Sequence, residues 1–358
     1  MKRRPHRLIV ASLVLALSTL NAFPQPDVLS VENPNGTYEF KLTFKVIDEA
    51  QAPIAGAKAA VEISDESRPR GVLRVEGRTN DQGLISIESR GDNSVKLWVT
   101  SPGFYPSEKR YSWKIEDAEA HGRATKSGLQ PWNPTVPVTL KRIGDRVPMF
   151  VFPGECPSSA VGVPPAVATD LLYDLMVGDW VAPFGVGKVG DLEMRFLGAY
   201  EAEGKHWGKY WMRFPNKGDG LIPVPSANGE ADSTFRFPGL APEDGYESGV
   251  FHKEYSVNDS GQVPDYRQMA EDEKDQQALL GYLLRFRCQR DEQGKITSCH
   301  YGKLTSPVKF IPTGRFSNKP LISFSYYLNP TPNDRRIEFD QETNLNKECT
   351  IPASNLAP

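Results

Sequence analysis

The stretch Tyr-Glu-Phe-Lys-Leu-Thr-Phe-Lys-Val-Ile-Asp, from Tyr38 to Asp48, decides the fold of this chain. Its apolar residues alternate with polar ones, and a period of two places the apolar set on one face of a β-strand. The apolar set is Phe40, Leu42, Phe44 and Val46. The stretch therefore predicts a strand with one buried face and one face in water, as found in a β-sandwich.

Several later segments carry the same alternation. It recurs at residues 57–64, 85–87, 95–99 and 136–140, and a turn signal lies at 80–83. At least five short strands within about a hundred residues are typical of a sandwich. We therefore predict a mainly β protein, with an N-terminal antiparallel β-sandwich followed by a second β-rich domain with one or two short helices.

The length of 358 residues exceeds that of a usual single domain, so we expect two domains. The expected parts are a signal peptide at 1–22, a linker at 23–36, the sandwich at 37–143, a linker at 144–166, a β-rich domain of unknown family at 167–342 and a C-terminal tail at 343–358. The best helix candidate is 167–176, and a polar segment at 268–277 is a second one.

The N-terminus has the pattern of a secretory leader. Four cationic residues among the first seven precede an apolar run at 8–20, and cleavage is expected before Phe23. The run is shorter than the about 20 residues of a membrane span. Loss of the four cations takes the formal charge from -3 to -7, which argues against a nucleic-acid partner. We expect a secreted or periplasmic protein with no membrane span after removal of the signal.

Four cysteines are an even number in a compartment where disulfide bonds persist. Gln293-Gly294 is a signal for a two-residue hairpin loop, and such a loop places Cys288 opposite Cys299 within disulfide reach. By elimination Cys156 pairs with Cys349. The alternative is four unpaired buried thiols.

The motifs of the first domain follow a definite order. They are Val46-Ile47-Asp48, Pro53-Ile54-Ala55-Gly56-Ala57, Thr79-Asn80-Asp81-Gln82-Gly83, Leu97-Trp98-Val99 and Pro102-Gly103-Phe104-Tyr105. Over residues 37–142 this order resembles the carboxypeptidase regulatory-like domain, a transthyretin-like β-sandwich. The resemblance implies a carbohydrate-binding-like fold, an extracellular setting and contact with glycans. It implies no catalytic residue, because this domain is an accessory module beside enzymes, transporters and adhesins.

Residues 185–190 fit the pattern G-x-G-x-x-G, but strand-like alternation follows where a dinucleotide site needs a helix. We interpret them as a glycine-rich loop between strands. The five histidines are not at metal-ligand spacing, so we predict no metal and no cofactor. Acidic residues at Asp179, Asp191 and Glu193 leave a hydrolase open as an alternative, because a glycosidase needs two carboxyl groups about 5 to 10 Å apart.

Aromatic residues motivate a binding function. Exposed large aromatic rings stack on sugars and often mark binding sites. Period-two alternation places Trp207 and Trp211 on one face of a strand, opposite Tyr210, and points Trp98 away from its apolar neighbours. The candidate ligand-binding residues are Trp98, Tyr105, Trp207, Tyr210 and Trp211.

The sequence therefore predicts a secreted or periplasmic non-enzymatic protein that binds an extracellular polymer, with carbohydrate as the first choice. One alternative is a cell-envelope structural or interaction protein whose aromatic residues seal the domain interface. A second alternative is a hydrolase with its site in the second domain. Solvent exposure of the tryptophans favours the first prediction, their burial favours the second, and a cleft with converging carboxylates favours the third.

Overall fold

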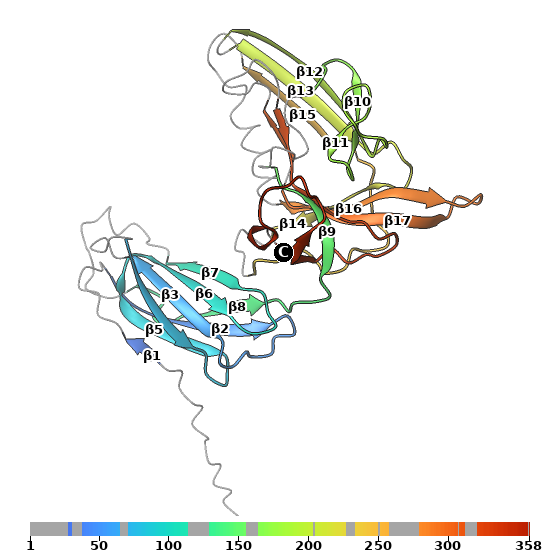
Figure 1. The fold of residues 1–358 in the computed structure, drawn as a ribbon. Helices are drawn as coiled ribbons and strands as arrows, with labels where there is room; N and C mark the ends of the chain where they lie inside the picture. The colour runs from blue at the N-terminus through green and yellow to red at the C-terminus, as the bar shows by residue number, and fades with distance from the viewer. Residues whose placement is uncertain are drawn as a thin grey trace, which may run out of the picture.

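The computed structural model is built almost entirely of β-strands (Figure 1). It describes residues 28–30, 38–64, 71–113, 129–154, 164–202, 205–226, 233–249, 251–257, 279–306, 308–311, 321–356 and 358. The predicted mainly β class is confirmed. The predicted signal peptide at 1–22 and the helix candidate at 268–277 lie outside the described residues.

The first domain is a sandwich of two four-stranded sheets (Figure 1). One sheet has the order β1-β5-β2-β8, with β1 Val28–Ser30, β5 Leu84–Gly91, β2 Tyr38–Asp48 and β8 Thr135–Leu140. The other has the order β4-β3-β6-β7, with β4 Val72–Arg78, β3 Lys58–Ser64, β6 Ser94–Thr100 and β7 Ser107–Ser112.

The deciding stretch is the central strand β2, and its alternate apolar side chains are fully buried between the sheets. The sandwich is not wholly antiparallel as predicted, because β1 runs parallel to β5 and β8 runs parallel to β2. The chain between β2 and β8 passes through β3 to β7, and so long a connection allows the two strands to run parallel.

The second domain contains two larger sheets. A five-stranded sheet has the order β11-β10-β12-β13-β15, with β11 Asp179–Trp180, β10 Asp170–Asp174, β12 Leu192–Ala202, β13 Lys205–Arg213 and β15 Phe251–Val257. A six-stranded sheet has the order β14-β16-β17-β20-β9-β21, with β14 Gly220–Pro225, β16 Leu279–Arg290, β17 Ile296–Leu304, β20 Tyr326–Asn329, β9 Val147–Phe152 and β21 Phe339–Asn344. Strands β18 Lys309–Ile311 and β19 Leu321–Ser323 form a separate pair.

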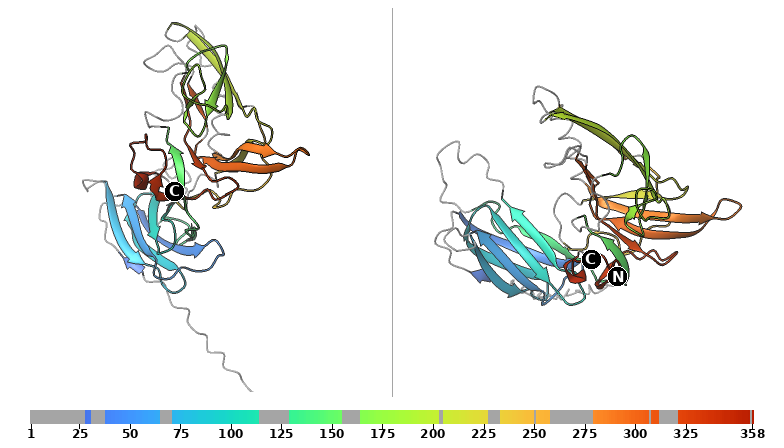
Figure 2. Two further views of the ribbon diagram at one scale, coloured as in Figure 1. Left: turned by 45° about the vertical axis from the view of Figure 1, so that its right-hand side comes forward. Right: turned by 45° about the horizontal axis from the view of Figure 1, so that its top comes forward.

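The six-stranded sheet, which Figure 2 shows from two further sides, contributes buried side chains to a core on each of its faces. Leu284 and Phe286 of β16 pack into the core shared with the five-stranded sheet, whereas Leu283 packs into a second core on the opposite face. A strand that is covered on both sides reads as a nearly continuous apolar run, and β16 and β20 have this composition.

Two sequence-based assignments in the second domain are wrong. Residues 167–176 do not form a helix, because Asp170–Asp174 is strand β10, paired with β12. A short leucine-rich run fits both periods, and here Leu171 and Tyr173 point inward while Leu172 is exposed. The predicted linker at 144–166 contains β9, so the second domain begins at Val147. Among the described residues, the only helical turn is the 3-10 helix η2, Ala353–Asn355, in the tail.

The predicted disulfide bond between Cys288 and Cys299 is confirmed, with a Cα separation of 4.2 Å. The expected two-residue loop is wrong, because Asp291 and Lys295 close a longer turn in which Gly294 has a φ of 81°. A register shift between Arg290 and Gln289 brings the two cysteines opposite each other, and a β-bulge at Arg287 shifts the register back beyond them. Cys156 lies outside the described residues, so its pairing with Cys349 stays a prediction.

The two domains meet at a buried carboxylate. Glu338 is 2% exposed and accepts hydrogen bonds from the Tyr105 hydroxyl at 2.6 Å and the Gly144 amide at 2.7 Å. The Tyr105 and Phe235 rings pack 5.3 Å apart, and the Thr234 amide donates to the Pro106 carbonyl. These contacts join the sandwich to the second domain.

Next to this interface lies Lys303, whose side chain is fully buried. Its ammonium group lies 4.6 Å from the centre of the Phe235 ring and 4.8 Å from that of Tyr327, and it donates a hydrogen bond to the Pro358 main-chain oxygen at 2.7 Å. Burial lowers the Lys303 pKa to about 7, although the Glu338 carboxylate opposes this effect.

We expect the burial of Lys303 to make the free energy of unfolding depend on pH. Between pH 7 and 10.5 the unfolded chain holds the Lys303 proton while the native chain releases it. The free-energy cost of burying the charged Lys303 side chain is therefore fully present below pH 7, and it diminishes as the pH rises above 7. Relative to Lys303→Met, the free energy of unfolding of the wild type should rise by on the order of 1 kcal/mol per pH unit in this window, measured by urea denaturation.

The control is Lys295→Met, which changes an exposed lysine of the hairpin loop. Its difference from the wild type should not vary over the same pH range. A pH-independent difference for Lys303→Met would contradict the assignment of a lowered pKa to Lys303.

Candidate functional site

The outer face of the β4-β3-β6-β7 sheet carries the candidate site. Alternation along β3 directs Val61 to the core and Ala60 outward, and along β6 it directs Leu97 to the core and Trp98 outward. Ala60 and Trp98 are cross-strand partners. A small side chain beside a large one leaves space above the sheet.

A hollow of about 710 Å³ lies beside these two residues and continues past the edge strand β4 to the opposite sheet. Its apolar lining includes Ala60, Trp98, Leu29 of β1 and Ile85 of β5. Gly77 of β4 also lines it, and a Cβ atom there would lie 3.0 to 3.1 Å from Leu29 and Ile85. The volume falls in the range of about 300 to 1,000 Å³ that small-molecule sites occupy. The hollow is thus large enough for a sugar unit.

Trp98 is half-buried in the wall of this hollow. The Lys96 ammonium lies 4.2 Å from the centre of its ring and forms an ion pair with Glu108 at 2.8 Å. The Trp98 indole N–H is buried and has no hydrogen-bond partner among the described residues. An unsatisfied buried donor is unfavourable, so this N–H would gain from an acceptor, which reaches it only when the side chains that cover it move.

The other candidate residues do not join Trp98 in one platform. Tyr105 is buried at the domain interface, and Tyr210 is buried in the core of the second domain. Trp211 is half-buried on the opposite face of β13 from Tyr210, with the Lys209 ammonium 5.7 Å from its ring centre. Trp207 also lies in β13, but its side chain is outside the described part of the chain. Figure 1 shows that β6 and β13 belong to different domains.

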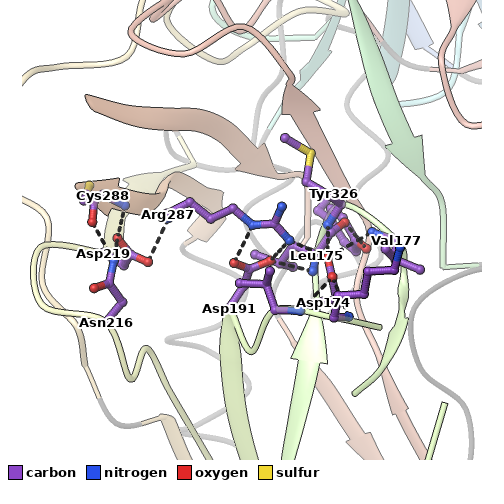
Figure 3. A network of polar contacts seen from close by, with 12 residues as sticks. Asp174, Leu175, Val177, Asp191, Asn216, Asp219, Arg287, Cys288 and Tyr326 are labelled. Carbon is purple, nitrogen blue, oxygen red and sulfur yellow. Dashed lines mark hydrogen bonds and ion pairs between the residues drawn. The ribbon is translucent and has the colours of Figure 1, made fainter. Parts of the chain in front are cut away.

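A second group of polar residues lies in the second domain (Figure 3). Arg287 sits in the β-bulge with a φ of 53°, and a bulge redirects a side chain out of the regular pleat. Its guanidinium contacts Asp174 at 2.5 Å and Asp191 at 2.9 Å. Both carboxylates are at most 2% exposed. Arg287 therefore links the six-stranded sheet to the five-stranded sheet through buried ion pairs.

The pKa values of the two carboxyl groups move in opposite directions. Burial raises the Asp191 pKa, and the Arg287 charge limits the rise. Burial also acts against the Asp174 carboxylate, but hydrogen bonds from the Lys188 and Val189 amides, together with Arg287, lower its pKa overall. Asp174 is therefore held as a carboxylate inside the domain.

The glycine-rich loop at residues 185–190 supplies these amide donors. The Lys188 and Val189 amides each donate to Asp174 at 3.0 Å, and the Val186 amide donates to Asp179 at 2.8 Å. The loop's amides therefore bind carboxylates of the same chain. The interpretation as a loop between strands, β11 and β12, agrees with the topology.

The remaining acidic residues of this region also have partners. Asp219 accepts hydrogen bonds from the Cys288 amide at 2.8 Å and from the Arg287 amide at 2.9 Å, and Glu193 pairs with Arg213 at 2.6 Å. These contacts hold the bulge and the neighbouring strands in place. Sequence reasoning selected Asp179, Asp191 and Glu193 but missed Arg287, because a bulge leaves no local signal in the sequence.

Within the described ranges, no three His, Cys, Asp or Glu side chains come together as a metal site. In the same residues, no helix has the length and apolar character needed to cross a bilayer.

No protein-family profile matches the chain, and no curated protein matches it. Among solved structures, 3-chlorocatechol 1,2-dioxygenase from Rhodococcus opacus 1CP aligns with 32% of this chain and 64% of its own, at 10% identity and a TM-score of 0.25. Catechol 1,2-dioxygenase from Acinetobacter radioresistens aligns with 33% of this chain and 58% of its own, at 14% identity and a TM-score of 0.25. The chain thus spans about three fifths of the length of these proteins. Likeness at this TM-score carries no argument about activity.

Substitution of Arg287 tests its structural role. Arg287→Met leaves the buried Asp174 and Asp191 without their cation, so the free energy of unfolding should fall by roughly 3 to 5 kcal/mol in urea denaturation. Arg290→Met on the same strand is the matched control, because Arg290 is exposed and should change stability by less than about 0.5 kcal/mol. Equal losses for the two variants would contradict the buried network. Adding Asp174→Asn and Asp191→Asn to Arg287→Met should restore part of the stability, since no unpaired charge then remains.

Proposed function

We propose that this protein is an exported, non-enzymatic binding protein whose first domain binds a carbohydrate polymer at the Trp98 hollow. The observation that carries this proposal is the half-buried indole of Trp98, which lines the hollow and whose N–H has no partner among the described residues. A half-buried aromatic ring matches the apolar face of a sugar, whose rim of hydroxyl groups takes polar partners nearby.

The rest of the hollow has the composition that a sugar site requires. Trp98 and Leu29 offer apolar surface, whereas Ala60 and Ile85 are at most 7% exposed, and Glu76 and Thr100 offer polar groups. Binding sites commonly combine a mainly apolar lining with a few polar groups that orient the ligand. A pyranose ring against Trp98 would direct its hydroxyl groups toward these polar side chains.

The proposed export agrees with two features of the chain. The first is the leader-like N-terminus, and the second is the disulfide bond between Cys288 and Cys299, since such bonds persist in oxidising compartments. The first domain's resemblance to the carboxypeptidase regulatory-like domain, an accessory module, is part of the same proposal.

An envelope structural or interaction protein is the second candidate function. It is favoured by Tyr105, which is buried at the domain interface with its hydroxyl on Glu338 and its ring against Phe235. These aromatic rings contribute to holding the two domains together. Trp98 distinguishes the two candidates, because it lies at the hollow and not at this interface.

The glycan proposal is tested by affinity electrophoresis of the purified protein in gels that contain a panel of neutral and acidic polysaccharides. We expect at least one polymer to retard the wild type. Trp98→Ala should raise the dissociation constant for that polymer about tenfold or more. Trp98 lies on the outer face of its sheet, so the variant should fold, which circular dichroism and thermal unfolding check.

Trp211→Ala is the matched control, because it removes a half-buried tryptophan from the other domain. This variant should be retarded like the wild type. The proposal fails when no polymer in the panel retards the protein, or when folded Trp98→Ala is retarded as strongly as the wild type.

A further inference from the structure

Lys58 and Arg78 face each other directly across strands β3 and β4 on the outer face of the sheet. Both side chains are exposed, and both line the hollow that contains Trp98. Thr100 of β6 is the other cross-strand partner of Lys58. These three residues form one row across the sheet, and the adjacent row contains Ala60 and Trp98.

Arg74 is the third cation that lines the hollow, and carboxylates match its charge. Arg74 pairs with Glu62 at 3.3 Å and with Glu76 at 3.2 Å, and Lys96 pairs with Glu108 at 2.8 Å. Arg110, opposite Lys96, also has no ion pair among the described residues, but it does not line the hollow. Among the cations that line the hollow, Lys58 and Arg78 differ from Arg74 in this respect.

In the row that holds Lys58, the Arg78 guanidinium donates to the Gly56 carbonyl at 2.9 Å. No carboxylate of the described residues lies within ion-pair distance of Lys58 or Arg78. Like charges directly opposite each other across two strands destabilise the sheet. The two unmatched cations also stand out in a chain whose formal net charge is -3.

We infer that Lys58 and Arg78 form a subsite for the carboxylate of an acidic polysaccharide whose sugar ring stacks on Trp98. This inference rests on the proposed function and names the class of glycan. Arginine presents a planar fork that matches a carboxylate, and lysine adds a compact charge beside it. The ligand's charge would remove the repulsion between the two cations.

The spacing of the rows fits neighbouring units of one polymer chain. Side chains two residues apart on a strand lie about 7 Å apart on the same face, and Trp98 lies one strand across from Lys58 and two strands from Arg78, at about 4.8 Å per strand. Two adjacent uronate units can span this distance, with one ring beside Trp98 and the carboxylate of the next unit near Lys58 and Arg78. The observations do not favour a nucleic acid, since a polyphosphate needs an extended run of cations and this chain is acidic overall.

The test compares three acidic polymers, polygalacturonate, alginate and hyaluronate, with neutral ones, including highly methyl-esterified pectin, by affinity electrophoresis. The esterified pectin has the galacturonate backbone without most of its charge. We expect stronger retardation by at least one acidic polymer than by any neutral one. The double variant Lys58→Gln/Arg78→Gln should raise the dissociation constant for that acidic polymer about tenfold or more, with neutral polymers unaffected.

Lys295→Gln is the control for a general loss of positive charge, since Lys295 is an exposed lysine of the second domain. It should be retarded like the wild type. The retardation of the wild type by the acidic polymer should also weaken as the ionic strength rises toward about 1 M, because salt screens exposed charges.

The possible outcomes separate this inference from the proposed function. Retardation by neutral polymers alone, or a double variant that is retarded like the wild type, overturns the carboxylate subsite and leaves glycan binding at Trp98 intact. No retardation by any polymer overturns both. Retardation by acidic polymers that the double variant loses but Trp98→Ala retains overturns the placement of the sugar ring on Trp98.

Discussion

The alternation of side chains along each β-strand is the constraint on which the rest of this structure depends. In β3, burial of Ala59, Val61 and Ile63 against the opposite sheet leaves Lys58 and Ala60 on the outer face. A register shift of one residue would exchange the two faces and bury the lysine. The core of the sandwich therefore determines which residues line the Trp98 hollow, and the site needs no separate element to position it.

Charged side chains inside the molecule have different surroundings from those on the outer face of the β4-β3-β6-β7 sheet. Inside, Arg287 is matched by Asp174 and Asp191, because an unpaired buried charge is very costly. Lys303 lies among aromatic rings instead, and its environment lowers its pKa to about 7. Exposed charges carry little cost in water, so the unmatched Lys58 and Arg78 persist without destabilising the fold severely.

Local patterns predicted a substantial part of this architecture. The strand from Tyr38 to Asp48, the outward direction of Trp98 and the bond between Cys288 and Cys299 follow from periodicity and turn signals. The same reasoning was wrong for residues 167–176, since a short apolar run fits both a helix and a strand. Pairing with β12 decided in favour of the strand.

By itself, the sequence determined the β class, the inward and outward faces of the strands and the cysteine hairpin, because these depend on residues close together in the chain. Only the tertiary structure decided that Tyr105 packs on Glu338 and that Arg287 reaches Asp174 and Asp191. It also decided that Lys58 lies opposite Arg78 beside Trp98. These contacts join residues of different strands, so they depend on sheet order, register and a bulge, none of which local periodicity encodes.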